Sequence, residues 1–425
     1  MNRQTRVPTK DRVKESLARR YRSERRFALY GFLSILFCFL FLGIFFVGIF
    51  RMGWNAFFET RIRLSIYLDP ELVMSYNVKD SDFNAILSTS LQKSFPDAKT
   101  RQEKRELAKL VAPGAEETIK DLVMKHPEAV GSTVELWLPA GDGINLLHKG
   151  AVSKEKAIQS GLITAKNLNR YETLLREGKV SIGFNKRFFT SGDSNTPSMA
   201  GIGGALVGSF YLMLVTITLS FPIGVGAAIY LEECAPRSKL TDIIDININN
   251  LTAVPSIIFG LIGLAIFLNF FKLPRSSPLV GGMVLSLMTI PVIVISAKSS
   301  LKSIPPSIRE AALSVGASRI QTIFHHVFPL ALPGMFTGTI LGMARAVGET
   351  APLLMIGMVA FIVDIPKKLT DSATALPVQI YLWSDQPERA FAEKAAAAII
   401  VLIFFMILMN SIAIILRKKY EQRYY

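Results

Sequence analysis

The chain has 425 residues, of which 50% are hydrophobic and 19% charged, and its formal net charge is +15. With a mean hydropathy of +0.36, this composition excludes an ordinary soluble protein and indicates an integral membrane protein. The chain has two cysteines, Cys38 within an apolar run and Cys234 beside a charged loop. Two cysteines in such different surroundings predict neither a disulfide framework nor a metal site.

Six apolar runs are long enough to cross a membrane as helices, each of which needs roughly 20 residues. They are Phe27–Phe50, Gly201–Leu231, Ile243–Phe271, Leu279–Ala297, Met335–Val363 and Ala395–Leu416. The first run is too long for a cleavable signal, and the "RMGWNAFF" that follows offers no small-residue cleavage site, so we expect a permanent anchor at 27–50. The runs predict an all-α polytopic membrane protein with six transmembrane helices.

Lysine and arginine residues indicate which side of the membrane each segment faces. The leader, residues 1–26, holds ten of them against three acidic residues, a bias typical of cytoplasmic segments. Counting six spans from there places the tail, residues 417–425, in the cytoplasm as well. The same count leaves a polar stretch at 303–333 on the cytoplasmic side.

The segment between the first two spans, residues 51–197, lies outside the cytoplasm by this count and is long enough for a domain. Its 21 basic and 18 acidic residues nearly balance, which argues against a surface for nucleic acid or another polyanion. The stretches "TRIRLSIYL", "STVELWLP" and "KVSIGF" predict strands, while Asp69 with Pro70 and the segment 153–178 predict helices. We expect an inserted α+β domain, which either docks a soluble partner or is a structural insertion.

The polar stretch at 303–333 has the local signals of two short helices. Pro305 and Pro306 end the preceding helix and can begin a new one, which contains Glu310 and the small Ala311 and Ala312. Gly316 can take the positive φ that ends such a helix.

A second helix is predicted from Ser318 and Gln321, which form a Ser-x-x-Gln capping box. Pro329 and Pro333 are expected to close the unit before the next span. The stretch predicts a bent helical pair that projects into the cytoplasm and fits a groove on another protein.

The sequence "REAALSVGAS" followed by "VFPLALPG" resembles the EAA loop of ABC-importer permeases, with matches at Glu310, Ala311, Ala312, Gly316 and Pro329. The resemblance implies the type I permease architecture, with a core at 198–416 and a coupling loop at 303–333. It also implies that this loop binds a dimer of ATP-hydrolysing subunits and passes their motion to the membrane helices.

The segment "ARAVGETAPLLMIG" resembles the PstA family of phosphate-transport permeases, and the resemblance extends over residues 197–416. It implies a permease for inorganic phosphate in the inner membrane of a bacterium. It further implies a second permease of similar fold and an extracytoplasmic phosphate-binding protein as partners. The long segment at 51–197 marks an elongated subgroup and receives no function from the resemblance.

Arg345 is a candidate contact for the transported anion. Counted from Gly334, it lies about 16 Å into the predicted fifth span, near the membrane midplane, where a lone cation costs on the order of 3 kcal/mol. Glu349, four residues on, can be its partner, and Thr350 adds a hydroxyl. In one reading Arg345 contacts the passing oxyanion while Glu349 holds or releases it. In the other the two form a permanent structural ion pair.

The sequence contains no G-x-x-x-x-G-K-[ST], H-E-x-x-H or G-x-S-x-G motif and no set of Cys and His ligands. We therefore expect no catalytic residue, metal or cofactor, and ATP hydrolysis in a separate chain. His325 and His326 are expected at the loop surface, and Lys298 is expected to extend to the lipid interface. Two alternatives remain, a permease for molybdate, sulfate or a phosphonate, and a membrane phosphate sensor.

Overall fold

The computed structural model describes residues 9–73 and 81–420. The chain divides into two compact units, residues 1–51 and 52–425, and each is described by itself. The first eight residues, residues 74–80 and the last five residues lie outside the described part. The predicted leader and tail are therefore described only in part.

The described part of the first unit is helix α1 (Thr9–Gly53). The first unit ends at Arg51, and the last two residues of the helix belong to the second unit. The helix runs without interruption from the leader into the predicted anchor at 27–50. Side chains along that anchor are exposed, with Phe27 at 81% and Phe37 at 69%. A helix that exposes apolar side chains on all sides is suited to a lipid environment.

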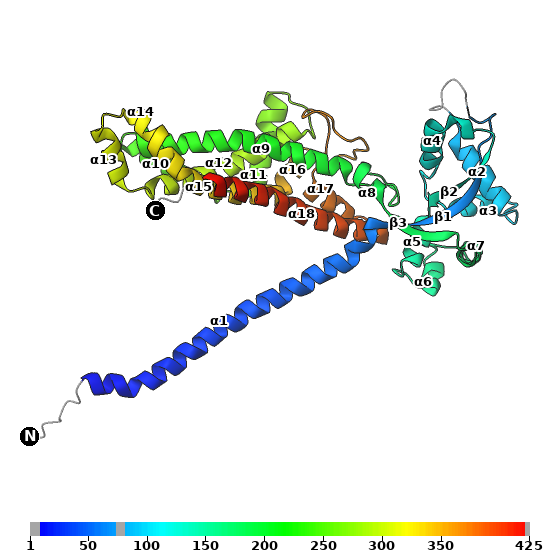
Figure 1. Ribbon diagram of the computed structural model, residues 1–425, viewed down its shortest axis with the longest axis horizontal. Coiled ribbons are helices and arrows are strands. Elements are labelled where there is room, and N and C mark those ends of the chain that lie inside the picture. The colour runs from blue at the N-terminus through cyan, green and yellow to red at the C-terminus, as the bar shows by residue number, and fades with distance from the viewer. Residues whose placement is uncertain (1–8, 74–80, 421–425) are drawn as a thin grey trace, which may run out of the picture. The chain divides into compact units, whose positions relative to one another are not determined.

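A three-stranded antiparallel sheet with the order β2-β1-β3 begins the second unit (Figure 1). The strands are β1 (Phe58–Tyr67), β2 (Thr133–Pro139) and β3 (Val180–Phe184), which confirms the three predicted strands. Ile62 pairs with both Leu138 and Val180. Ile62, Leu64 and Ile66 are buried on one face, as the two-residue period of a strand requires.

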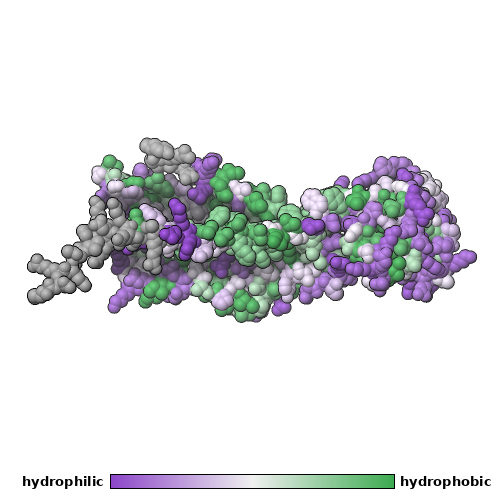
Figure 2. All heavy atoms as spheres, turned by 90° about the horizontal axis from the view of Figure 1, so that it is seen from below, coloured by the Kyte–Doolittle hydropathy of each residue, from purple (hydrophilic) through white to green (hydrophobic). Residues whose placement is uncertain are grey.

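Helices accompany this sheet to form what we call the sheet domain, residues 58–190. They are α2 (Phe83–Ser94), α3 (Arg101–Ala108), α4 (Glu116–Lys125), α5 (Asp142–His148), α6 (Lys154–Gln159), α7 (Ala165–Arg176) and α8 (Lys186–Thr190). One hydrophobic core joins β1 to the helices. The surface of the domain, at the right of Figure 2, is mostly hydrophilic. The predicted α+β character is confirmed.

Two helix predictions in this domain need correction. Asp69 and Pro70 begin a turn over residues 70–72, in which Asp69 Oδ1 accepts a hydrogen bond from the Glu71 amide at 3.0 Å. Residues 74–80 of that predicted helix lie outside the described part. The predicted helical segment 153–178 is two helices, because Ser160 to Thr164 interrupt it between α6 and α7.

The remainder of the second unit is helical. Its helices are α9 (Gly203–Ile229), α10 (Lys239–Leu251), α11 (Ser256–Gly263), α12 (Pro278–Lys302), α13 (Pro306–Ser314), α14 (Arg319–Gln321), α15 (Phe328–Gly348), α16 (Ala351–Met355), α17 (Leu376–Ser384) and α18 (Arg389–Tyr420). Short π-helical segments extend α9 to Cys234 and α11 to Phe270, and join α14 to α15. Within residues 9–73 and 81–420, five helices are long and apolar enough to span a membrane, or six if a bent pair counts as one.

Two predicted spans differ from the structure. The third, Ile243–Phe271, is bent by 104° between α10 and α11, next to Pro255. The fifth, Met335–Val363, is wrong: the helix runs from Arg319 to Gly348. Pro329 and Pro333 lie inside this helix and do not end it. Pro329 is tolerated because it stands in the first turn after the π-helical segment.

Helix α12 packs between α9 and α15, and glycines make the contacts close. A Cβ atom on Gly282 would lie 2.5 Å from Val215 Cβ of α9, and one on Gly338 of α15 would lie 2.1 Å from Ser296 Cβ. Gly208 of α9 is equally confined, 2.1 Å from the Thr374 carbonyl oxygen. Gly338 and Gly342 therefore serve helix packing against α12, whereas Gly204 and Gly208 make room for the segment between α16 and α17.

Gly282→Val should destabilise the helix bundle, because the new side chain overlaps Val215. Overpacking of this kind costs about 1–3 kcal/mol, and the thermal unfolding temperature of the purified chain in detergent should fall accordingly. Gly226→Val is the matched control, since nothing lies within 4 Å of a Cβ atom at Gly226. Equal unfolding temperatures for the two variants would contradict the close packing of α9 and α12.

Candidate functional site

The cytoplasmic stretch predicted at 303–333 forms the expected helical pair. Pro306 is the first residue of α13, and Gly316, with φ of +90°, follows the end of that helix. Ser318 begins α14 with the predicted capping box: its Oγ accepts from the Gln321 amide at 3.3 Å, and Gln321 Oε1 accepts from the Ser318 amide at 2.9 Å. These predictions are confirmed. Each of them depends only on residues that are neighbours in the sequence.

Glu233, in the π-helical segment that ends α9, fixes both helices of the pair. Its carboxylate lies 2.5 Å from Arg309 Nη2 of α13, and its carbonyl accepts from Arg319 of α14 at 2.5 Å. Arg309 also donates to the carbonyls of Ile304 and Leu301 at the end of α12. Sequence reasoning missed Glu233, because its partners lie far along the chain. The only sequence signal is the paired acids in "LEEC".

Exposed apolar side chains cover the outer face of the pair. Val315 is 84% exposed, Ile320 69%, Phe324 53% and Leu313 50%. Exposed apolar residues gathered in this way are typical of a surface that contacts another protein or a membrane. We call these four residues the apolar tip.

The predicted coupling residues divide into three groups around the apolar tip. Glu310, Ala311 and Gly316 are exposed beside it. Ala312 is buried, 6% exposed, and supports α13 from beneath. Pro329 is half-buried at the start of α15, away from this surface. His325 and His326 are exposed, as expected.

Arg345 and Glu349 form the predicted pair, with Nε 3.4 Å from Oε1. Arg345 lies in the last turn of α15, about 39 Å along the helix that begins at Arg319. Its depth in the membrane stays a prediction. Its side chain is 46% exposed and that of Glu349 is 19% exposed. Thr350 follows, half-buried, and its carbonyl accepts from the Leu353 amide at 3.0 Å at the start of α16.

The segment after Glu349 is held against α11 by glycine. A Cβ atom on Gly260 would lie 2.8 Å from Pro352 Cα, so α16 rests directly on the α11 backbone. Gly263 in turn lies against Val284 of α12: a Cβ atom on Gly263 would lie 2.3 Å from Val284 Cγ2. Glu349 directly follows α15, and its amide donates to the Ala346 carbonyl at 3.2 Å, so it stays at the end of the helix that carries Arg345.

Lys298 corrects another prediction. Its Nζ lies 2.5 Å from Asp245 Oδ1 of α10, and its side chain is only 13% exposed. The Lys298 side chain binds the Asp245 carboxylate and does not extend away from the helices. The ion pair fixes α10 against α12.

Comparison with known proteins identifies the family to which the chain belongs. Residues 220–424 match the family described as binding-protein-dependent transport system inner membrane component, and residues 14–158 match a domain of unknown function. The phosphate transport system permease protein PstA of Haemophilus influenzae is 31% identical over 215 residues, which are 51% of this chain and 74% of that protein. The chain belongs to the PstA permease family.

Other relatives match this PstA-family chain over a similar stretch. The probable ABC transporter permease proteins YqgI and YqgH of Bacillus subtilis are 32% and 34% identical over 46% and 37% of the chain. The chain spans 65% and 52% of their lengths, less than two thirds of each. The MetNI methionine ABC transporter, solved in an inward-facing form, is 16% identical with a TM-score of 0.41, over 52% of this chain and 95% of that one.

Arg309→Met should loosen α13, because the Glu233 carboxylate loses its partner in a part-buried site. Amide hydrogen exchange in α13 should rise by about tenfold, the change expected for about 1.4 kcal/mol of lost coupling. Lys302→Met is the control: it removes a contact of 3.6 Å to Glu232 by a lysine that is 61% exposed. Exposed pairs of this kind contribute little, so exchange in α13 should not change. Equal exchange in both variants would show that Glu233 does not hold the pair.

Proposed function

We propose that this chain is a transmembrane permease subunit of an ATP-driven importer for inorganic phosphate. Membership of the PstA family supports this proposal, as does the relative from Haemophilus influenzae that is named for phosphate transport. The assignment of phosphate as the substrate rests on Arg345, which is half exposed. Its guanidinium is only loosely held by Glu349, at 3.4 Å. A planar guanidinium presents paired donors that match the oxygens of a phosphate.

The apolar tip and its neighbours Glu310, Ala311 and Gly316 would bind the ATP-hydrolysing partner. Glu233 supports this role, because it prevents α13 and α14 from moving independently of the membrane helices. Motion of the partner would then pass through Pro329 into α15. The unbroken helix from Arg319 to Gly348 leads from this surface to Arg345.

Arg345 and Glu349 would act as an exchangeable pair. A phosphate that reaches Arg345 competes with the Glu349 carboxylate for the same donors, and Thr350 adds a hydroxyl close by. The pair stands at the end of α15, just before helix α16, which rests on α11, so a shift of α15 against α11 would change the geometry of the pair. The pair would then hold or release the anion as the permease changes conformation. The chain itself performs no covalent step in this mechanism.

The membrane topology follows from the same proposal. If the bent pair of α10 and α11 counts as one span, the described helices give six crossings, an even number that would keep both ends of the chain on one side. The basic leader favours the cytoplasm as that side. The segment 51–197 then lies outside the inner membrane of a bacterium. A second permease, a dimer of ATP-hydrolysing subunits and an extracytoplasmic phosphate-binding protein would complete the assembly.

Arg345→Glu should abolish uptake, because the reversed charge repels both phosphate and Glu349. The measurement is uptake of radiolabelled phosphate by cells that lack their own high-affinity system and express this chain with its partner proteins. The rate should fall by at least about tenfold at equal protein level. Arg237→Glu, at an exposed cytoplasmic position, is the matched charge reversal and should leave uptake unchanged. Intact phosphate uptake in Arg345→Glu would show that Arg345 and Glu349 form only a structural ion pair. Uptake of sulfate or molybdate instead of phosphate by the wild-type complex would show that the substrate is another oxyanion.

Gly316→Val should uncouple the permease from ATP hydrolysis, because a β-branched residue is strained at φ of +90° and turns α14 away from α13. Phosphate uptake should fall while the complex still hydrolyses ATP. Gly178→Val carries comparable strain at φ of +69° in the sheet domain and serves as control. Similar losses of uptake in both variants would point to general misfolding and against a coupling role.

A further inference from the structure

Lys394, in the second turn of α18, is buried and takes no part in the mechanism above. Its side chain is 7% exposed. Its Nζ donates a hydrogen bond to the carbonyl oxygen of Ala200, just before α9, and lies 5.8 Å from the centre of the Phe188 ring. A buried ammonium group requires compensation by an opposite charge or strong acceptors.

The compensating charge comes from Asp142, the first residue of α5 in the sheet domain. Asp142 and Lys394 line the same small cavity, about 30 Å³ in volume. Burial raises the pKa of Asp142 to about 6, and the positive charge of Lys394 offsets part of that rise. The neighbouring cation and hydrogen bonding by Ser198 therefore help to keep the carboxylate of Asp142 charged at neutral pH.

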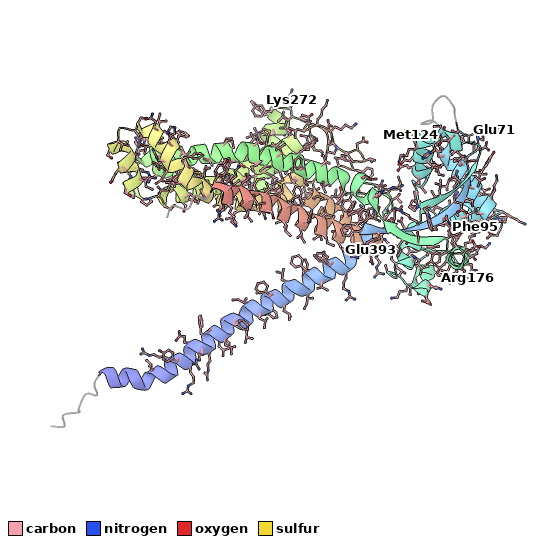
Figure 3. All side chains as sticks on the ribbon, in the orientation of Figure 1. Glu71, Phe95, Met124, Arg176, Lys272 and Glu393 are labelled. Atoms are coloured by element: carbon pink, nitrogen blue, oxygen red, sulfur yellow. The ribbon has the colours of Figure 1, made fainter. Side chains whose placement is uncertain are left out.

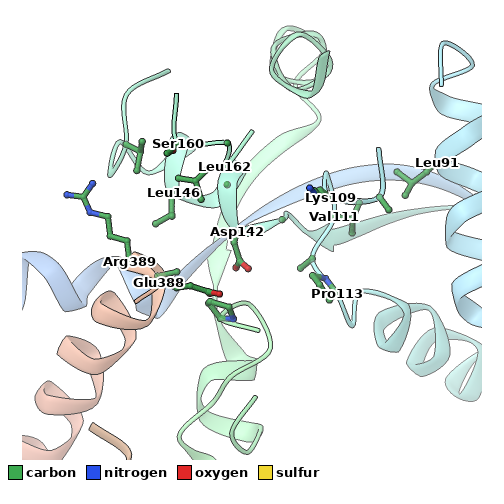
Figure 4. A pocket seen from close by; sticks show the side chains of 18 of the residues that line it. Leu91, Lys109, Val111, Pro113, Asp142, Leu146, Ser160, Leu162, Glu388 and Arg389 are labelled. Atoms are coloured by element: carbon green, nitrogen blue, oxygen red, sulfur yellow. The ribbon is translucent and has the colours of Figure 1, made fainter. Parts of the chain in front are cut away.

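Other charged groups surround this pair on every side. They are Glu59 of β1, Lys149 at the end of α5, Arg187 of α8, Glu388 before α18 and Glu393 within it. Figure 3 shows Glu393 where α18 meets the sheet domain, and Figure 4 shows Asp142 and Glu388 together in a pocket of that region. Glu388 raises the pKa of Asp142 further, and burial lowers the pKa of Lys149. Lys394 is the most buried cation of the group.

Apolar contacts join the same three parts of the molecule. Ala390, at the start of α18, packs against the core of the sheet domain. Phe188 of α8 lies 6.3 Å from Trp383, which in turn lies 6.2 Å from Phe391 of α18. The charged group is thus enclosed between the sheet domain, the segment leading into α9 and the first turns of α18.

We propose that Lys394 is a positioning residue for transport: its charge compensates Asp142 and so holds the sheet domain against α18 and the segment leading into α9. The three parts then move as one body when the permease changes conformation. The link to transport rests on the proposed function, whereas the attachment itself does not.

Proton linkage gives the attachment a defined pH dependence. Asp142 binds its proton more tightly when it is enclosed, so this contribution to the attached arrangement is full below the ordinary aspartate pKa of 3.8 and is lost as the pH rises from there through about 6. Without the charge of Lys394 the enclosed carboxylate is less tolerated still, and the weakening at neutral pH becomes larger. Loss of the carboxylate charge, by acid or by Asp142→Asn, should remove the need for Lys394.

The test compares Lys394→Met with the double variant Lys394→Met/Asp142→Asn in the full transport complex, reconstituted in liposomes. Lys186→Met, at an exposed lysine of α8, is the control. At about pH 7.5, Lys394→Met should lower phosphate uptake by about fivefold or more relative to wild type, and at about pH 5.5 by less than about twofold. The double variant should stay within about twofold of wild type at both pH values. Amide exchange in α5 and residues 197–202 should follow the same pattern.

Three results would overturn the proposal. One is a Lys394→Met complex that matches wild type at neutral pH in both uptake and exchange. Another is a defect that neither acid nor Asp142→Asn relieves, since Lys394 would then act without Asp142. The third is a double variant whose exchange shows a detached sheet domain. A wild-type complex that hydrolyses ATP but moves no phosphate would refute the proposed function alone, because amide exchange still tests the attachment.

Discussion

The close approach of α12 to its two neighbours is the constraint on which the rest of the membrane region depends. It is possible because glycine stands where the helices meet: Gly282 leaves room for Val215, and Gly338 leaves room for Ser296. In a lipid environment burial of apolar surface gives little preference for one helix neighbour over another, so tight packing has to supply that preference. With α12 fixed between α9 and α15, both ends of the bundle acquire defined positions for charged side chains.

At the end that carries the apolar tip this packing brings Glu233 of α9 within reach of Arg309 and Arg319. At the other end it places Arg345 beside a segment that rests on α11 through Gly260. In each case a carboxylate meets a guanidinium, and neither pair is fully buried. The first pair joins two helices, and the second stands at the end of α15. Pairs of this kind hold a conformation without making it irreversible, which suits a protein that must change shape.

The sequence predicted features that depend on neighbouring residues and missed those that depend on distant ones. Alternation around Ile62 identified β1, and Ser318 with Gln321 identified the start of α14, because strand period and capping act within a few residues. The fifth span was misplaced because hydropathy does not distinguish an apolar helix from the apolar turn that follows Gly348. The pairing of Asp142 with Lys394 could not be read from the sequence, since it exists only after the sheet domain meets α18.

The unbroken helix from Arg319 to Gly348 connects the apolar tip with Arg345. Its 30 residues span about 45 Å, so a tilt of about 5° around its middle displaces each end by about 2 Å. A displacement of that size at Gly348 would move Arg345 and Glu349 relative to α11, on which the following helix α16 rests. A small rotation at the apolar tip would therefore shift the charged groups at the far end of the helix, and no large rearrangement of the bundle is required.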